Sequence, residues 1–274
     1  MRKVIRVMLF IMGLAFCFFP LVSELKEQRY LQDTVATYHK EVATMEVENK
    51  EAELERARLY NQTLFQLQEN QLDGGVDEVL SQKNYDSLFN QGKNGVMGSV
   101  EIPKIGVNLP VYHGTSEEVL SVGAGHVQES SLPIGGTSTR TIITGHRGLP
   151  NSKLFTRLDE MEKGDLFYLH TMGEILAYQV REIQVIKPEK VDVLKIKEGE
   201  DLATLITCTP YGINSHRLLV TGERIPYVEQ EYEEIQEKMM SPRELVFLAL
   251  PFLFLTMGIV TVVKEIRKKG KHEK

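Results

Sequence analysis

The chain carries one long apolar segment near each end, and these two segments constrain its organisation more than any other feature. Residues 1–22 contain no charged side chain after Arg6 and are rich in Phe, Leu, Ile and Met. Residues 244–263 are uncharged after Glu244. Since about 20 apolar residues suffice to cross the hydrocarbon core of a bilayer, the pattern predicts an N-terminal transmembrane anchor and a C-terminal transmembrane helix.

Basic residues lie on the outer side of both apolar segments. Arg2, Lys3 and Arg6 flank the first, and the tail 264–274 is rich in Lys and Arg. The positive-inside rule then predicts that both termini are cytoplasmic. Residues 23–243 would form an extracytoplasmic part that two spans hold at the cell membrane.

Each apolar segment has an alternative interpretation. The first resembles the apolar core of a cleaved signal peptide, but Phe18-Phe19-Pro20 is bulky where a cleavage site needs small residues, so we favour an uncleaved anchor. The second could be a buried C-terminal helix. The chain has 42% hydrophobic and 26% charged residues, which is ordinary for a globular protein, and its net charge of -6 argues against a general nucleic-acid partner.

Residues 23–94 read as a helical region. From residue 23 to about 70 the chain contains no Pro or Gly, and Leu31, Val35, Tyr38, Val42 and Met45 recur at helical spacing. This apolar stripe predicts packing against the protein's own domain, and a partner-binding stalk is the alternative. Residues 66–82 are polar and read as a loop, followed by a short helical turn over 85–90.

From residue 95 to 226 the sequence changes to short apolar or alternating runs separated by Gly, Pro, Asn or Asp. These runs are 98–102, 107–112, 140–144, 165–171, 175–186, 202–208 and 217–225. Short helical stretches are expected between them at 116–120, 154–158 and 195–199. Many short strands at this spacing predict a mainly β fold, either a closed barrel or a sandwich. Residues 227–243 read as an acidic linker to the second apolar segment.

Cys208 ends one of the predicted strands, after the run Thr204-Leu205-Ile206-Thr207. The other cysteine, Cys17, lies in the first apolar segment. A lone thiol outside the membrane cannot form a disulfide within the chain, so Cys208 is either inert and buried or a nucleophile.

Two further residues favour the nucleophile. His146 follows the apolar run 140–144 in a glycine-flanked loop, and Arg217 begins the strand after Cys208. An imidazolium stabilises a thiolate and can donate a proton to a leaving amine, while a guanidinium can hold a substrate carbonyl or a developing oxyanion. The three residue types describe acyl transfer through a thioester. His126 and His216 compete with His146 for the role of proton donor.

The motif Thr204-Leu205-Ile206-Thr207-Cys208, with Arg217 after it and Thr144-Gly145-His146 before it, resembles the sortase family of Gram-positive bacteria. The resemblance implies a closed eight-stranded sortase β-barrel. It also implies that Cys208 is the nucleophile, that His146 is its proton partner and that Arg217 holds the substrate and the oxyanion. Thr207 and Thr144 would contribute to substrate binding beside the thiol.

The two predicted membrane spans and the Cys208-Thr209-Pro210-Tyr211-Gly212 context are most similar to class C, the pilus sortases. This implies that LPxTG-type sorting signals are cleaved and joined to a pilin lysine amine, with side hydrolysis. A housekeeping-type sortase that anchors surface proteins to a cell-wall amine is the alternative. A hydrolytic thiol protease and a non-catalytic membrane-tethered adaptor stay open as further interpretations.

Class C enzymes commonly carry a lid with an Asp-Pro-aromatic motif, and no Asp-Pro occurs in this chain. Residues 66–82 are the expected place for a lid, with Asp73 or Asp77 as its acidic anchor, and 86–89 is a weaker match. We expect no cofactor and no metal. Three glutamates, Glu117, Glu118 and Glu129, lack the ligand spacing of an EF-hand calcium site, and no zinc spacing or phosphate-binding loop is present.

Overall fold

The structure is a computed structural model that describes residues 2–69, 78–90, 92, 94–148, 154–235, 249–261 and 264. It divides into two compact units. The first comprises Met1–Gln28 and Met239–Lys274, and in it a helical stretch over 249–261 accompanies the start of helix α1. The rings of Phe18 and Phe252 meet edge-on there, with centroids 5.7 Å apart. The second unit is Arg29–Lys238.

No helix within the described residues is both long enough and apolar enough to span a membrane. The two expected spans also include residues 1, 244–248, 262 and 263, which lie outside the described residues.

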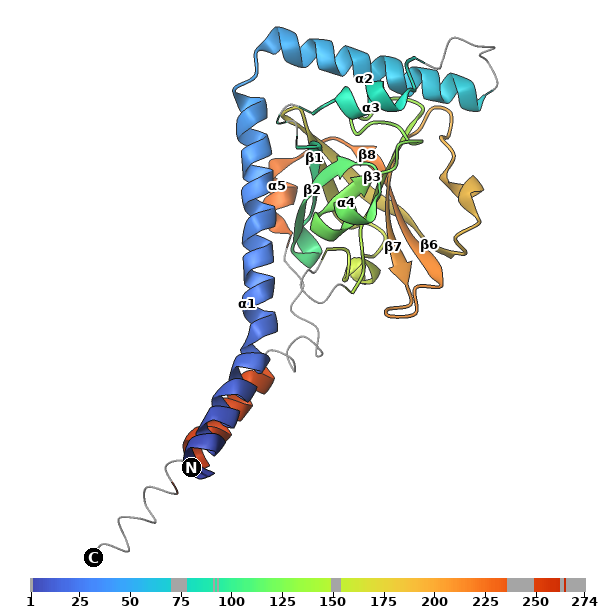
Figure 1. Cartoon of the computed structure of the whole chain (residues 1–274). Helices are drawn as coiled ribbons and strands as arrows, with labels where there is room; N and C mark the ends of the chain where they lie inside the picture. Colours follow the sequence, from blue (N-terminus) through green and yellow to red (C-terminus); the bar gives the residue numbers. More distant parts are fainter. Residues whose placement is uncertain are drawn as a thin grey trace, which may run out of the picture. The chain divides into compact units, whose positions relative to one another are not determined.

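Eight strands of the second unit close into a barrel (Figure 1). They are β1 (Val96–Ile102), β2 (Val107–His113), β3 (Ala124–His126), β4 (Thr139–Thr144), β5 (Leu166–Thr171), β6 (Glu174–Ile186), β7 (Asp201–Thr209) and β8 (His216–Ile225). The order around the barrel is β1-β2-β3-β4-β7-β8-β6-β5, and β5 pairs back with β1. The β2–β3 and β4–β7 pairs are parallel and the others antiparallel. The expected closed eight-stranded barrel is confirmed.

The short connecting elements follow the sequence less closely. They are η1 (Pro103–Ile105), α4 (Glu117–Val122), η2 (Leu158–Glu160), η3 (Val191–Leu194) and α5 (Glu229–Glu234). The helix expected over 195–199 is wrong, because the helical turn lies earlier, at η3. The backbone of Ile196 explains the difference. Its N–H and C=O both bond to the side-chain amide of Gln68, at 2.8 and 3.0 Å, so they cannot form the hydrogen bonds of a helix. The stretch 154–158 is a turn that leads into η2.

The helical region consists of α1 (Arg2–Ala43), α2 (Val47–Gln68) and α3 (Gln82–Ser87). The expected continuous helix over 23–70 is therefore interrupted at residues 44–46. The apolar stripe of α1 packs on the barrel as predicted: Leu31, Val35, Tyr38 and Val42 are each at most 5% exposed. The hydroxyl of Tyr38 donates to the carbonyl of Met97 at 3.1 Å. The interruption turns the chain, so that α2 crosses one end of the barrel (Figure 1). One side of α2 is buried there, with Ala57 and Tyr60 among its buried residues.

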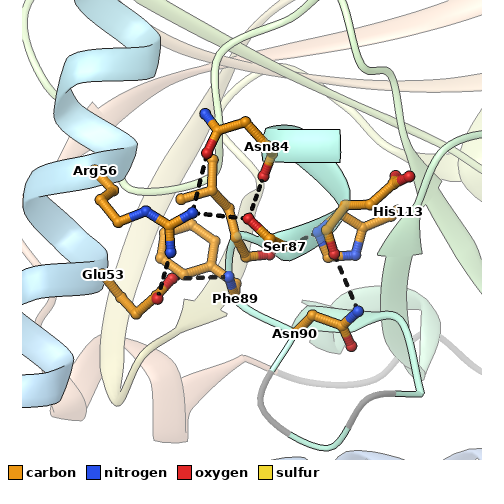
Figure 2. A network of polar contacts seen from close by, with 9 residues as sticks. Glu53, Arg56, Asn84, Ser87, Phe89, Asn90 and His113 are labelled. Atoms are coloured by element: carbon orange, nitrogen blue, oxygen red, sulfur yellow. Dashed lines mark hydrogen bonds and ion pairs between the residues drawn. The ribbon is translucent and has the colours of Figure 1, made fainter. Parts of the chain in front are cut away.

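A polar network joins α2 to the segment that precedes β1 (Figure 2). Arg56 of α2 pairs with Glu53 at 2.8 Å and donates to the side chains of Asn84 and Ser87 in α3, at 3.0 and 2.7 Å. Glu53 also accepts the backbone N–H of Phe89 at 3.2 Å. The network holds α3 and the fully buried Phe89 in place against the barrel.

Part of the predicted lid, 66–82, lies outside the described residues. Residues 66–68 belong to α2 and 82 begins α3, whereas 70–77 lie outside the described residues, Asp73 and Asp77 among them. The weaker match at 86–89 is the end of α3 and the buried pair Leu88 and Phe89, which belong to the core.

The two faces of β7 serve different purposes. Successive side chains of a strand point to opposite faces, and Ala203 and Leu205 belong to the main core of the molecule. Ile206, between Leu205 and Thr207, belongs instead to a second small cluster with Ile142 of β4 and Leu219 of β8. Cys208 shares the face of Ile206, so its side chain extends from the second cluster and not from the main core.

Candidate active site

Two parallel strands bring the predicted histidine and cysteine to one edge of the barrel. In the β4–β7 pair, Thr144 lies opposite Ile206, and this is where the pairing of β4 ends. His146 follows two residues after Thr144, in the loop beyond β4, and Cys208 follows two residues after Ile206, on β7. Because parallel strands run in the same direction, both residues lie toward the same edge of the barrel.

Arg217 comes to the same edge from the other side of β7. In the antiparallel β7–β8 pair it lies directly opposite Cys208. Side chains at directly opposed positions share a face, with Cβ atoms about 4.5–5.5 Å apart. Arg217 and Cys208 are both half-buried, and one guanidinium nitrogen of Arg217 donates to the carbonyls of Asn214 and His216, at 3.2 and 3.1 Å. The structure therefore brings the three predicted residues to one place.

The two predicted threonines hold the histidine loop against the cysteine strand. The hydroxyl of Thr207 donates to the carbonyl of Gly145 at 2.8 Å, and the N–H of Gly145 donates to the carbonyl of Ile206 at 3.0 Å. The hydroxyl of Thr144 also donates to the carbonyl of Ile206, at 3.3 Å. Thr207 is 1% exposed, and its hydroxyl is engaged in holding the loop.

Gly145 is required at its position by close packing. A Cβ atom there would lie 2.8 Å from the ring of Phe155, which is fully buried and has no room to move aside. The backbone N–H of Phe155 in turn donates to the carbonyl of His146 at 3.1 Å. The small residue before the histidine thus lets the loop lie flat on the core.

Arg147 is a residue of this site that the sequence pattern did not predict. Its side chain is 7% exposed, and its guanidinium pairs with Asp159 and donates to the hydroxyl of Thr209 at 3.1 Å. It also lies over the ring of Tyr211, 6.0 Å from the centroid. Arg147 directly follows His146, and Thr209 directly follows Cys208. The hydrogen bond between the two side chains therefore links the chain beside the histidine to the chain beside the cysteine. Its place directly after His146 was the available signal.

The imidazole of His146 is paired with a carboxylate. Its Nε2 lies 3.2 Å from Glu117 Oε1 of α4, and the two side chains are 24% and 82% exposed. In the described part of the chain, His146 makes no hydrogen bond to Cys208. The sequence pattern marks Glu117 only as a glutamate without calcium-ligand spacing and does not predict its contact with His146.

His126 cannot take the place of His146, because it is fully buried in the barrel wall. Its Nε2 lies 2.9 Å from the carbonyl of Ser131 and its Nδ1 lies 3.0 Å from the hydroxyl of Tyr85. Burial lowers the pKa of His126 to about 4. A neutral ring that donates to Ser131 and accepts from Tyr85 satisfies both contacts. His216, the other competitor, lies opposite Thr209, with its Nδ1 2.9 Å from the hydroxyl of Ser215.

A small apolar cluster lies on the same face of β7 as the cysteine. The second cluster of Ile142, Ile206 and Leu219 is bordered by Val127, Ile186 and Leu194. A thiol beside a guanidinium and an imidazole is suited to attack a carbonyl carbon.

A cavity of about 630 Å³ lies at the opposite end of the barrel. It is lined by α2 and by residues such as Thr139 at the start of β4 and Arg224 near the end of β8. It is thus separate from the edge that carries Cys208. Within the described residues, no group of three His, Cys, Asp or Glu side chains is arranged to hold a metal ion.

The chain matches known proteins over this part. The family model described as the Sortase domain matches residues 100–225. "Sortase A" of Streptococcus agalactiae serotype III (strain NEM316) is 34% identical over 117 residues, which cover 42% of this chain and 47% of the relative. The chain therefore spans about half the length of that curated relative.

Solved structures match more completely. Sortase C of Streptococcus pneumoniae, reported with insights into pilin substrate specificity, is 43% identical with a TM-score of 0.62, covering 71% of this chain and 97% of its own. Sortase C of Clostridium perfringens, solved with the C-terminal cell wall sorting motif, is 37% identical with a TM-score of 0.61, covering 71% and 99%.

Proposed function

The chain belongs to the sortase family, and on that premise we propose that it is a membrane-anchored cysteine transpeptidase that joins pilins. The observation that carries the proposal is the position of Arg217 directly opposite Cys208, beside the strand end that leads to His146. Among the predicted roles, this arrangement supports acyl transfer best.

The proposed reaction has two halves. The Cys208 thiolate attacks the threonine carbonyl of an LPxTG-type sorting signal, and Arg217 stabilises the oxyanion that forms. When the C–N bond breaks, His146 donates a proton to the leaving amine and a thioester remains. An acceptor amine then attacks the thioester, and the new amide leaves Cys208 free. Hydrolysis is the side reaction in which water replaces the amine.

The threonines and Arg147 support this chemistry without touching the reacting atoms. Thr207 and Thr144 bond to the backbone on either side of the β4–β7 seam, and Arg147 bonds to Thr209. We propose that they set the separation between the imidazole and the thiol, since catalysis is sensitive to displacements of about 1 Å.

Pilin assembly is the more specific part of the proposal. It is supported by the sortase C structures, one of them reported with pilin substrate specificity. The acceptor would be a pilin lysine amine, and a cell-wall amine is the competing acceptor. Membrane attachment through 1–22 and 244–263, with residues 95–226 outside the cytoplasm as the catalytic part, is supported by apolar length and flanking charge in the sequence.

The test uses the full chain in detergent with an LPxTG-type peptide. We expect a covalent adduct at Cys208 in the intact mass of the protein, and no adduct in Cys208→Ala. The peptide is then supplied with a lysine-bearing pilin peptide or with a cell-wall amine. Faster product formation with the lysine peptide supports pilin assembly, a preference for the wall amine supports anchoring to peptidoglycan, and failure to form the adduct contradicts the transpeptidase.

A further inference from the structure

The first half of the proposed reaction assigns no role to the contact between His146 and Glu117. Cleavage of the sorting signal needs a thiolate, a proton donor and an oxyanion partner, and none of these is a second carboxylate. Glu117 nevertheless lies 3.2 Å from His146 Nε2. The position suggests a role in the second half of the reaction, in which an amine approaches.

Glu117 is presented from a helix that cannot easily move. The hydroxyl of Ser116 accepts the N–H of Val119 at 3.3 Å and caps α4. Val119 and Val122 on the other face of the helix pack against the main core. The helix is therefore fixed beside the imidazole, while the side chain of Glu117 is 82% exposed to solvent.

The pair adds little to the stability of the fold. Exposed ion pairs contribute a few tenths of a kcal/mol to about 1 kcal/mol because water and salt screen them. A carboxylate in such a pair exchanges its partner readily. Glu117 is thus free to leave the imidazole for a cation that arrives from solvent.

We propose that Glu117 is the residue that recognises the acceptor, by binding the ammonium group of the incoming lysine. The inference rests on the proposed function. A lysine amine has a pKa near 10.4 in model peptides, so it arrives as a cation and must lose a proton before it can attack. A carboxylate beside His146 holds the ammonium next to the base that accepts this proton.

The protons balance in this step. The ammonium carries three N–H bonds: one proton passes to His146 Nε2, one is released to solvent and one stays on the new amide. The nitrogen lone pair forms the C–N bond as the thioester carbonyl becomes an oxyanion beside Arg217. The C–S bond then breaks, its electrons stay on Cys208, and the enzyme returns as a thiolate with an imidazolium.

The test separates acceptor recognition from a merely positional role of Glu117. In the full chain in detergent, the acylation rate of Cys208 by the sorting peptide is measured first. The acyl-enzyme is then treated with a lysine-bearing peptide or with hydroxylamine, which is mostly uncharged at neutral pH. For Glu117→Gln we expect roughly a fivefold rise in KM for the lysine peptide, in keeping with an exposed charge pair, and unchanged acylation and hydroxylamine rates.

Glu118→Gln is the matched control, because Glu118 carries the same charge one residue further along α4 without a described contact to His146. It should leave every rate unchanged, and Glu117→Asp should restore part of the lysine preference. An unchanged lysine KM in Glu117→Gln overturns the inference, as does an equal loss in acylation, lysine and hydroxylamine rates, which would mean that Glu117 only orients the ring. If the wild-type protein forms no acyl-enzyme, the proposed function itself fails.

Discussion

Cys208 and Arg217 lie directly opposite each other, one residue pair before the β7–β8 pairing ends at Thr209 and His216. The strand ladder fixes the backbone of Arg217 opposite Cys208, and the hydrogen bonds to the carbonyls of Asn214 and His216 restrict its guanidinium before a substrate arrives. In the proposed reaction, this guanidinium stabilises the oxyanion that forms beside the sulfur. This preorganisation is what makes electrostatic stabilisation effective.

Replacing Arg217 tests that relationship. Arg217→Ala should lower kcat for cleavage of the sorting peptide by about 10²–10³-fold, the usual cost of removing an oxyanion donor. Arg217→Lys should recover only part of the rate, since an ammonium lacks the planar fork of donors. Peptide cleavage is followed by chromatography, and alkylation of Cys208 by iodoacetamide serves as the control for an intact site. An Arg217→Ala variant with a near-normal rate would remove Arg217 from the mechanism.

The bond between Arg147 and Thr209 gives a second prediction. Arg147→Met keeps the bulk of the side chain and removes the hydrogen bond at 3.1 Å, and Thr209→Val removes the same bond from the other side. Each change should lower kcat roughly tenfold with little effect on KM, because the separation of His146 and Cys208 is disturbed.

The double variant distinguishes this coupling from independent effects. Residues in direct contact show interaction free energies, so the losses in the double variant should be less than the product of the two single losses. A loss in kcat of the double variant equal to the product of the two single losses would mean that the two residues act separately.

The sequence carried enough information for the architecture of the barrel. Seven of its strands are runs of alternating or continuous apolar residues bounded by turn residues, and this pattern is visible without any tertiary contact. The eighth, β3, has only three residues, Ala124–His126, which is too short for a period to be recognised. The helix expected at 195–199 failed because Gln68, far away in the sequence, bonds to the backbone of Ile196.

The residues of the candidate site that lie at strand ends were predictable from the sequence. Cys208 and Arg217 are separated by a hairpin-length interval, which alone favours their meeting across two strands. Arg147 and Glu117 were not predictable in the same way. A buried arginine and an exposed glutamate have ordinary sequence surroundings, and their roles depend on contacts between the loop after β4, β7 and α4.

Thr207 provides a test of how the histidine loop is held. Thr207→Val preserves the shape of the side chain and leaves the buried carbonyl of Gly145 without the hydroxyl that donates to it at 2.8 Å. An unsatisfied buried acceptor costs about 1–3 kcal/mol, so the free energy of unfolding in urea should fall by that amount. Thr207→Ser, which keeps the hydroxyl, is the control and should lose less. Equal losses in both variants would mean that the methyl group matters and the hydrogen bond does not.

His126 makes folding stability depend on pH. Burial lowers its pKa from 6.5 to about 4 in the folded state. Between these two pH values the unfolded chain therefore binds a proton at His126 and the folded chain does not. This contribution to stability is present above about pH 6.5 and is lost as the pH falls towards 4, by about 3 kcal/mol in all. Urea unfolding at several pH values should show the loss, and His126→Gln should show a flatter dependence than wild type. If His126→Gln does not fold, the ring signals of His126 in the wild-type protein decide the matter: a shift between pH 8 and 5 would contradict the buried neutral ring.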